Sequence, residues 1–299
     1  MKYRPKHVAE YLLLRAVCLP VSLLPYRLAL LLAAALAAPV YLLMRRRRLE
    51  AIRRIRAVMG PAYPLRQARR DAWISFRNLA FSLAEMLYLS RHAALPQPVD
   101  LADALAKLRA WIAENPGRGG LFACPHMGNW ELAGIVAPAA GVDLFSIFAE
   151  QKNPLVNRWM LRLRHDDSLS LLSRSQPGLV KTVLSNLRKG KFLAILPDLR
   201  SRNPGVPVPF FGGTVNTYAG LGKFAVQARV PVFLAIERRE GWTRHSISLL
   251  GPWYPDPAAD KDAEAQRLIA LVLAQIDAAV RQDPSQYFWY NSRWVLDPL

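Results

Sequence analysis

The sequence predicts an α/β protein, with a mostly parallel, twisted sheet flanked by helices and preceded by an N-terminal membrane-anchoring helix. Two observations lead to this fold class. After Gly119, short apolar runs alternate with segments of helical periodicity, the pattern of a parallel sheet covered on both faces. Before residue 60, a long uncharged run is followed directly by arginines. We therefore expect a membrane anchor with a polybasic flank over residues 1–56 and an α/β domain over residues 57–299.

The uncharged run covers residues 28–44, which carry no charge at 17 positions. As a helix rising about 1.5 Å per residue it would measure roughly 25 Å, slightly short of a hydrocarbon core of about 30 Å. The preceding apolar stretch, residues 11–24, is broken by Arg15 and Pro20, so the two stretches could form a short span or an in-plane hairpin. Arginines dominate residues 45–56, and the positive-inside bias then places residue 45 onward in the cytoplasm.

The net charge is +18 and the sequence pI is about 10.5, and most of the positive charge lies near the N-terminus. Residues 1–70 hold 15 Lys and Arg against Glu10 and Glu50, a net +13, whereas the rest of the chain has only +5. Such a polybasic flank attracts anionic lipid headgroups. A nucleic-acid binder would instead need basic residues interleaved with aromatics on a folded face, and the sequence has no such motif.

Two further interpretations of the apolar N-terminus remain open. It could be a core helix, or a cleaved signal peptide with a site near Ala37-Ala38, although cleavage there would leave arginines at the new terminus. Hydrophobic residues make up 52% of the chain, enough for a packed core. Cys18 and Cys124 both lie in apolar stretches, so we expect buried thiols and no disulfide framework.

The elements follow from periodicity and from turn residues. A helix over residues 71–94 has an apolar face and is ended by a proline-containing segment, and a helix over 101–114 ends at Asn115-Pro116-Gly117. Strands are expected at 120–125, 142–149, 192–197, 230–236 and 245–250. Further helices are expected at 131–140, 153–164, 177–189, 217–228 and 260–282, before an aromatic tail at 287–294.

His126 follows the first predicted strand directly, where ligands of α/β sheets gather. Gly128 and Asn129 form a turn, and Trp130 and Glu131 open the next helix. The Glu131 carboxylate could reach one imidazole nitrogen of His126 and fix its tautomer, leaving the other nitrogen as a general base for a substrate hydroxyl. The alternative is a structural histidine beside a carboxylate that merely favours the helix N-terminus.

The surrounding motifs decide between these interpretations, because from His126 onward the chain resembles the bacterial lipid A biosynthesis (lauroyl/myristoyl) acyltransferases, within the lysophospholipid acyltransferase superfamily. The resemblance covers about residues 120–294 and rests on an ordered series of blocks. These are His126 to Glu131 (H-x-x-x-x-E), Asn153-Pro154 through Arg164, Asp198 through Phe210-Phe211-Gly212, Thr217 with Gly220, and Pro284 to Trp294.

The resemblance implies an O-acyltransferase that moves a fatty acyl chain from an acyl thioester to a hydroxyl of a membrane glycolipid, most simply a lipid A precursor. His126 would be the base and Glu131 its orienting partner, without an acyl-enzyme. Arg164, Asp198 and Asn129 become candidates for binding substrate, an oxyanion or phosphate. Phe210, Phe211 and Trp130 become candidates for an acyl groove. The expected partners are acyl carrier protein or acyl-CoA as donor and a phospholipid membrane, at the cytoplasmic face of a bacterial inner membrane.

The sequence lacks the motifs that other reaction types would require. No G-x-S-x-G elbow supports an acyl-serine, no histidine spacing supports a metal, and no P-loop or G-x-G-x-x-G supports a nucleotide cofactor, so we expect no cofactor. Two alternatives stay open: an acyltransferase for another glycolipid or a lysophospholipid, and a non-catalytic membrane adaptor with the same fold.

Overall fold

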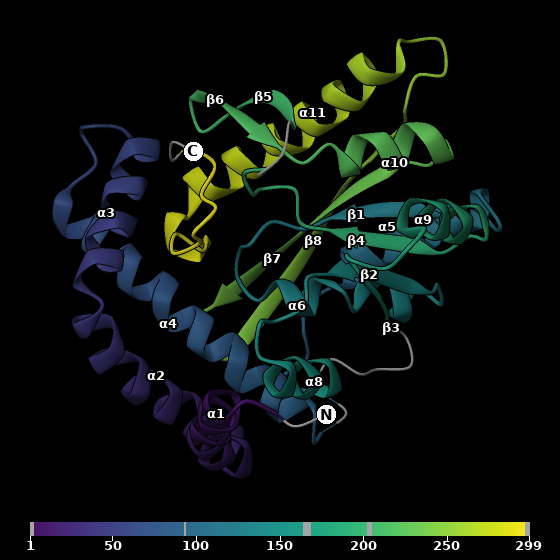
Figure 1. Ribbon diagram of the computed structural model, residues 1–299. Helices are drawn as coiled ribbons and strands as arrows, with labels where there is room; N and C mark the ends of the chain where they lie inside the picture. Colours follow the sequence, from purple (N-terminus) through teal and green to yellow (C-terminus); the bar gives the residue numbers. More distant parts are fainter. Residues whose placement is uncertain (1–2, 93, 164–168, 202–204, 297–299) are drawn as a thin grey trace.

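The computed structural model describes residues 3–92, 94–163, 169–201 and 205–296 (Figure 1). Five helices come first: α1 (Pro5–Leu23), α2 (Tyr26–Leu43), α3 (Arg45–Met59), α4 (Leu65–Leu89) and α5 (Ala102–Glu114). The strands that follow are β1 (Gly120–Ala123), β2 (Leu144–Phe148), β3 (Leu169–Ser173), β4 (Phe192–Ile195), β5 (Val206–Phe210), β6 (Gly213–Thr217), β7 (Val232–Glu240) and β8 (Arg244–Trp253). Between and after them lie α6 (Trp130–Ala133), α7 (Val136–Ala139), α8 (Pro154–Leu163), α9 (Leu179–Arg188), α10 (Gly220–Ala228) and α11 (Lys261–Gln282).

The main sheet confirms the predicted α/β class. Its strand order is β3-β2-β4-β1-β7-β8, with every neighbouring pair parallel except the antiparallel edge pair β7–β8. The central strands β1 and β4 pair from Gly120 with Phe192 to Ala123 with Ile195. This register sets which residues meet at the carboxyl edge of the sheet.

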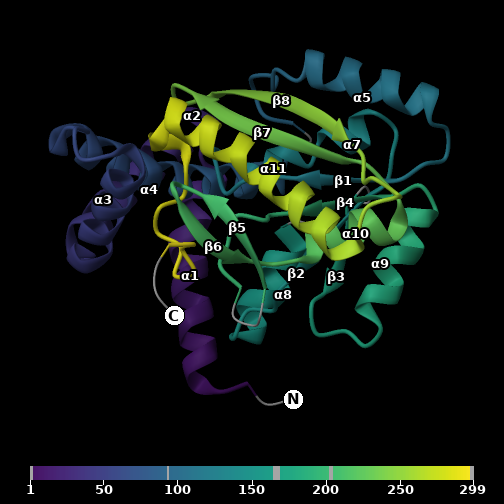
Figure 2. The ribbon, with the colours of Figure 1, turned by 90° about the horizontal axis from the view of Figure 1, so that it is seen from above.

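Side chains of the central strands alternate between two apolar layers, because successive residues of a strand point to opposite faces. Leu121 and Ala123 of β1 belong to the core cluster that includes helices α9, α10 and α11, whereas Phe122 belongs to the cluster on the other face with α5 and α7. Figure 2 shows α5 and α11 on opposite sides of these strands. Both faces are therefore covered, as the near-continuous apolar runs predicted.

The N-terminal helices pack onto the α/β domain through α4. Figure 1 shows α4 running between α2 and the rest of the molecule, with α3 near one end. A third apolar cluster joins Cys18 of α1, Leu30 of α2 and Phe81 of α4. α2 is the one helix in the described part of the chain that is long and apolar enough to cross a membrane, and a third of that window is buried.

The structure differs from the sequence prediction in four places. The helix predicted at 71–94 runs from Leu65 to Leu89, and the one predicted at 131–140 is two short helices, α6 and α7. Strand β3 was not predicted, because its alternating Ser and Leu residues lack a sustained apolar run. The β5–β6 hairpin was not predicted either, because Pro207 and Pro209 argue against a strand and are tolerated only where no ladder partner needs their N–H.

Candidate active site

His126 and Asp198 meet at the carboxyl edge of the sheet because β1 and β4 are adjacent and parallel. Ala123 pairs with Ile195, and His126 and Asp198 each lie three residues further along the chain. The backbone N–H of His126 donates to Asp198 Oδ2 at 2.8 Å, and the His126 ring Nδ1 lies 2.8 Å from Asp198 Oδ1. One carboxylate therefore holds both the backbone and the ring of His126.

This arrangement suits a general base. The Asp198 side chain is fully buried, while the His126 side chain is 15% exposed. A carboxylate at Nδ1 favours the tautomer that carries its proton there, and it stabilises an imidazolium when Nε2 takes a proton from substrate. Tyr287 Oη donates to the Asp198 carbonyl at 3.3 Å, and Thr217 Oγ1 donates to the Pro197 carbonyl at 2.6 Å, so the aspartate is itself held in place.

The sequence analysis expected Glu131 to bond one imidazole nitrogen. In the structure the carboxylate on Nδ1 is that of Asp198, which comes from the neighbouring strand rather than from the following helix turn. Glu131 lies in the first turn of α6, directly after Trp130, whose ring meets the His126 ring at a centroid distance of 5.2 Å. Both Glu131 and Trp130 line an apolar cavity.

The cavity has a volume of about 430 Å³ and lies between α1, α2 and α4. Apart from Glu131 and Ser82 its wall is apolar, and Trp130 also lines it. Its lining includes Val17, Cys18, Val21, Ala33, Leu36, Ala37, Val40, Phe76, Leu79, Ala80, Leu83, Ala84, Met86, Leu87 and Met160. A cavity of this size and composition fits a hydrocarbon chain.

Asn129 is buried, and it makes hydrogen bonds within the protein around the turn that follows His126. Its side-chain Oδ1 accepts from the Glu131 N–H at 3.3 Å and caps α6, while its Nδ2 donates to Glu85 Oε2 at 2.7 Å. Its backbone N–H donates to Glu237 Oε2 in a short hydrogen bond. Gly128 adopts a left-handed φ of 58°, and an added Cβ there would overlap with the same Glu237 carboxylate. The turn after His126 is therefore pressed against Glu237.

These contacts belong to a buried charge cluster, which we define as Glu85 of α4, Glu237 and Arg239 of β7, and His245 of β8. Arg239 makes a bidentate pair with Glu85, at 2.5 and 2.6 Å. His245 bridges the two acids, with Nδ1 at 2.6 Å from Glu237 Oε1 and Nε2 at 3.1 Å from Glu85 Oε1. Four side chains from three elements thus fix the loop that carries His126.

Charge pairing shifts the pKa values of Glu85 and His245 against the effect of burial. Burial alone would raise the pKa of Glu85, but hydrogen bonds and charge from Arg239, with a smaller contribution from His245, lower it to about 2. Burial alone would lower the pKa of His245, but its hydrogen bonds to Glu237 and Glu85 raise it above the usual value. The pairing with Arg239 therefore keeps the buried Glu85 carboxylate ionised.

The C-terminal tail closes the site from the other side. Phe288 N–H donates to the His126 carbonyl at 2.8 Å, and Gly128 N–H donates to the Gln286 carbonyl at 2.9 Å. Ser75 of α4 in turn donates to the Tyr287 carbonyl at 2.5 Å. The aromatic tail predicted from sequence therefore holds the turn that carries His126 through backbone hydrogen bonds.

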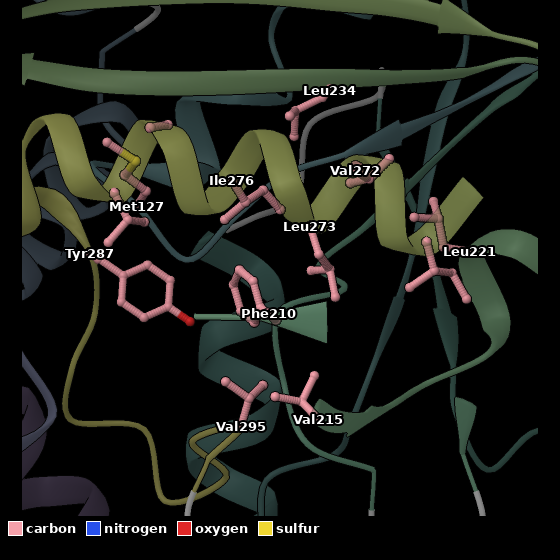
Figure 3. Packing of buried hydrophobic residues seen from close by; sticks show 14 of the residues in the cluster. Met127, Phe210, Val215, Leu221, Leu234, Val272, Leu273, Ile276, Tyr287 and Val295 are labelled. Carbon is pink, nitrogen blue, oxygen red and sulfur yellow. The ribbon is translucent and has the colours of Figure 1, made fainter. Parts of the chain in front are cut away.

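The remaining predicted residues fall elsewhere. Phe210 and Phe211 are buried in the core, where Phe210 lies beside Tyr287 and Val215 below α11 (Figure 3), and neither lines the cavity. The acyl-groove prediction for these two residues is therefore not supported by their position, whereas Trp130 does line the cavity. Arg164 lies outside the described residues.

Cys124, two residues before His126, is a neutral thiol. Burial, with smaller contributions from the Asp198 and Glu131 charges, raises its pKa to about 12. Because the thiolate is the nucleophilic form, this cysteine is unsuited to attack on an acyl group. Both cysteines are buried and free, as predicted.

Sequence reasoning missed the charge cluster entirely. Glu85 stands in an amphipathic helix, and Glu237, Arg239 and His245 stand in or beside apolar strands, so no motif connects them. The one available signal was the placement of charges within segments predicted to be buried, where an ion must be paired.

Comparison with known proteins finds a matching family and several relatives. The family described as bacterial lipid A biosynthesis acyltransferase matches residues 2–295. A phosphatidylinositol mannoside acyltransferase of Mycolicibacterium smegmatis is 25% identical over 213 residues, which are 69% of this chain and 66% of that protein. A lipid A biosynthesis acyltransferase of Haemophilus influenzae is 25% identical over 181 residues, 59% of this chain and 54% of that protein. The chain thus spans between about half and two thirds of the length of these two relatives.

Proposed function

Because the chain belongs to the bacterial lipid A biosynthesis acyltransferase family, we propose that it transfers a fatty acyl group from a thioester to a hydroxyl of a membrane glycolipid. The observation that carries the proposal is the His126–Asp198 pair at the carboxyl edge of the sheet, next to an apolar cavity. A base beside a hydrocarbon-sized cavity is what transfer of a long acyl chain requires.

In the proposed reaction His126 Nε2 takes the proton of the acceptor hydroxyl as the oxygen attacks the thioester carbonyl. The tetrahedral intermediate then collapses, the carbon–sulfur bond breaks, and the leaving thiolate takes the proton back from His126. Asp198 stabilises the imidazolium between these steps. Glu131 remains a catalytic candidate beside Asp198, because it follows His126 in the same motif and lines the cavity next to Trp130.

The cavity is the proposed seat of the acyl chain. Trp130 and Glu131 stand at its His126 end, and the lining of α1, α2 and α4 continues away from the base. A thioester carbonyl held near His126 would therefore direct its alkyl chain between these helices, where burial of methylene groups supplies binding energy at about 0.8 kcal/mol each.

The acceptor is proposed to be a lipid A precursor or a related glycolipid. The names of the relatives, a lipid A biosynthesis acyltransferase and phosphatidylinositol mannoside acyltransferases, share a glycolipid acceptor. The donor is proposed to be acyl carrier protein or acyl-CoA, and the site is proposed to face the cytoplasm from the bacterial inner membrane. The basic surface would steer an acidic carrier protein, so kcat/KM for a protein-bound donor should fall steeply with added salt.

The test is mass spectrometry of membrane lipids from cells with and without the gene. We expect one glycolipid to lose the mass of a single acyl chain when the gene is absent, and to regain it with the wild-type gene but not with His126→Ala. Unchanged glycolipid masses, or full restoration by His126→Ala, would reject the proposed function and favour a non-catalytic adaptor.

A further inference from the structure

The N-terminal helices α1 and α2 present an apolar surface that nothing in the described chain covers. Of the 18 large hydrophobic side chains that are exposed in the described part of the chain, 12 lie on these two helices. They include Leu13, Leu23 and Leu43, which are 69%, 60% and 84% exposed. A surface of this kind in a protein with a polar exterior elsewhere marks an interaction site.

The opposite faces of the same helices pack against the α/β domain. Tyr26 at the start of α2 donates to Glu85 Oε1 at 2.8 Å, and Tyr41 near its end donates to the Arg69 carbonyl at 3.5 Å. Both residues bonded in this way belong to α4, so α2 lies alongside α4 over most of its length. Between the two tyrosines, Ala29, Leu30, Ala33 and Ala37 are buried.

α1 is tied down at its beginning as well. Asn153, which caps α8 through its side-chain oxygen, donates from Nδ2 to the His7 carbonyl at 2.9 Å and to Glu10 Oε2 at 3.0 Å. The hairpin of α1 and α2 is therefore attached to the α/β domain at its start, at its turn and at its end.

These attachments decide between a span and an in-plane hairpin. If α2 crossed a bilayer, α4 would have to cross beside it, and α4 carries six charged residues: Arg66, Arg69, Arg70, Asp71, Arg77 and Glu85. α4 is in addition bonded to the C-terminal tail through Ser75 and through the Ala72 carbonyl, which accepts from Tyr290 Oη at 2.7 Å. Charged groups at the centre of a bilayer are strongly disfavoured, and the whole domain cannot follow α4.

Charge identifies the covering partner. α3 follows α2 directly, and Arg45, Arg46 and Arg47 at its start are exposed beside Leu42 and Leu43. An apolar face bordered by exposed arginines complements the hydrocarbon and the anionic headgroups of one leaflet. Arg54, which the sequence analysis counted in the basic cluster, is buried and donates to the Trp289 carbonyl at 2.6 Å, so it joins α3 to the domain instead.

We infer that α1 and α2 lie in the plane of one leaflet of an anionic bilayer, without crossing it. The exposed arginines at the start of α3 then contact the lipid headgroups. The apolar cavity then opens into the hydrocarbon, because Val17, Leu36 and Val40 both line it and stand exposed on the same surface. A lipid chain would enter from the bilayer and reach Trp130 without passing through water. The inference concerns how the protein meets the membrane and does not depend on the reaction at His126.

The test is the depth of single nitroxide labels along α2, measured by electron paramagnetic resonance in the full-length protein on phosphatidylethanolamine–phosphatidylglycerol vesicles. Labels at Leu28→Cys, Leu36→Cys and Leu43→Cys are suitable because all three native side chains are exposed, whereas Cys18 and Cys124 are buried. Leu28 and Leu43 are about 22 Å apart along the helix at about 1.5 Å per residue.

For an in-plane helix all three labels should lie at a similar shallow depth, about 5–10 Å below the headgroups. A label at Val180→Cys on α9, which is 54% exposed on another helix, should report no lipid contact. A spanning helix would place Leu36 deepest and the labels at Leu28 and Leu43 near opposite headgroups, and that result would overturn the inference, as would a protein that does not partition onto the vesicles.

The contribution of the α3 arginines to vesicle binding can be tested with a matched control. Arg45→Gln/Arg46→Gln should weaken partitioning onto anionic vesicles by about fivefold for each charge removed. Lys181→Gln/Arg188→Gln removes the same charge from exposed positions of α9 and should change partitioning by less than about twofold, since headgroup attraction falls off within a Debye length. Equal losses in the two variants would contradict the orientation.

Discussion

At the scale of single residues, the proposed mechanism depends on which carboxylate orients His126, the proposed base. The sequence spacing favoured Glu131, whereas the strand register places Asp198 on Nδ1 of His126 at 2.8 Å. His126 and Asp198 are separated in sequence by the same number of residues as each pair of facing residues in β1 and β4. The two side chains therefore meet because the parallel register of these strands continues past their ends. The dyad is therefore a property of two adjacent strands.

Asp198→Asn should lower kcat about 10²- to 10⁴-fold with little change in KM, because an amide cannot stabilise the imidazolium and disturbs the tautomer. Steady-state kinetics with a saturating acceptor would measure this. The paired variant Glu131→Gln separates the roles of the two carboxylates. A kcat for Asp198→Asn within tenfold of wild type would show that Asp198 does not orient the base.

His245 provides a prediction about stability and pH. A histidine whose folded pKa is raised stabilises the protein fully below its unfolded value of about 6.5, and this contribution is lost as the pH rises through the folded value. The groups that face it are Glu85, Glu237 and Arg239. The difference in unfolding free energy between wild type and His245→Gln should therefore shrink as the pH is raised from 6 to 9. Denaturant unfolding at each pH measures it, and a difference that grows with pH would refute the assignment.

At the scale of elements, the catalytic loop depends on its close contact with β7. Gly128→Ala should place a methyl group against the Glu237 carboxylate and displace His126, so kcat should fall by more than tenfold. Gly141→Ala is the matched control, because Gly141 has a similarly positive φ of 82° but nothing within 4 Å of an added Cβ. Equal losses in kcat in both variants would attribute the effect to backbone strain alone.

The helices around the cavity lead to a prediction about substrate length. Ala80 of α4 lines the cavity, so Ala80→Phe should occupy part of its volume of about 430 Å³. We expect kcat/KM for a long acyl donor to fall at least tenfold while that for a short donor stays within threefold. A uniform loss for both chain lengths would indicate that the acyl chain binds elsewhere.

The elements that sequence reasoning found and missed differ in one physical property. Strands β1 and β4 are continuous apolar runs, and β2 and the first half of β7 are largely apolar, so composition alone located them. Strand β3 at the sheet edge and the β5–β6 hairpin depend on pairing between distant or proline-containing segments, which no local pattern records. The charge cluster was missed for the same reason, since its members come together only through tertiary packing.

At the scale of the whole molecule, the N-terminal quarter packs against the α/β domain through buried contacts. α4 is packed between the apolar hairpin and the sheet, and it contributes Glu85 to the charge cluster behind His126 (Figure 1). The boundary predicted at residue 56 therefore separates segments that are joined by buried hydrogen bonds. In the proposed arrangement, the membrane-facing surface of α1 and α2, the cavity and His126 follow one another from one side of the molecule inward.

The most direct test of the proposed function is acyl transfer by the purified full-length protein, with an acyl thioester donor and a glycolipid acceptor in anionic vesicles. We predict that mass spectrometry finds one acyl chain on the acceptor and that His126→Ala lowers the rate at least 10²-fold. We also predict that intact-protein mass spectrometry detects no acylated enzyme during turnover. A His126→Ala variant with the wild-type rate, or an acylated protein that accumulates and then transfers its chain, would contradict general-base catalysis by this histidine.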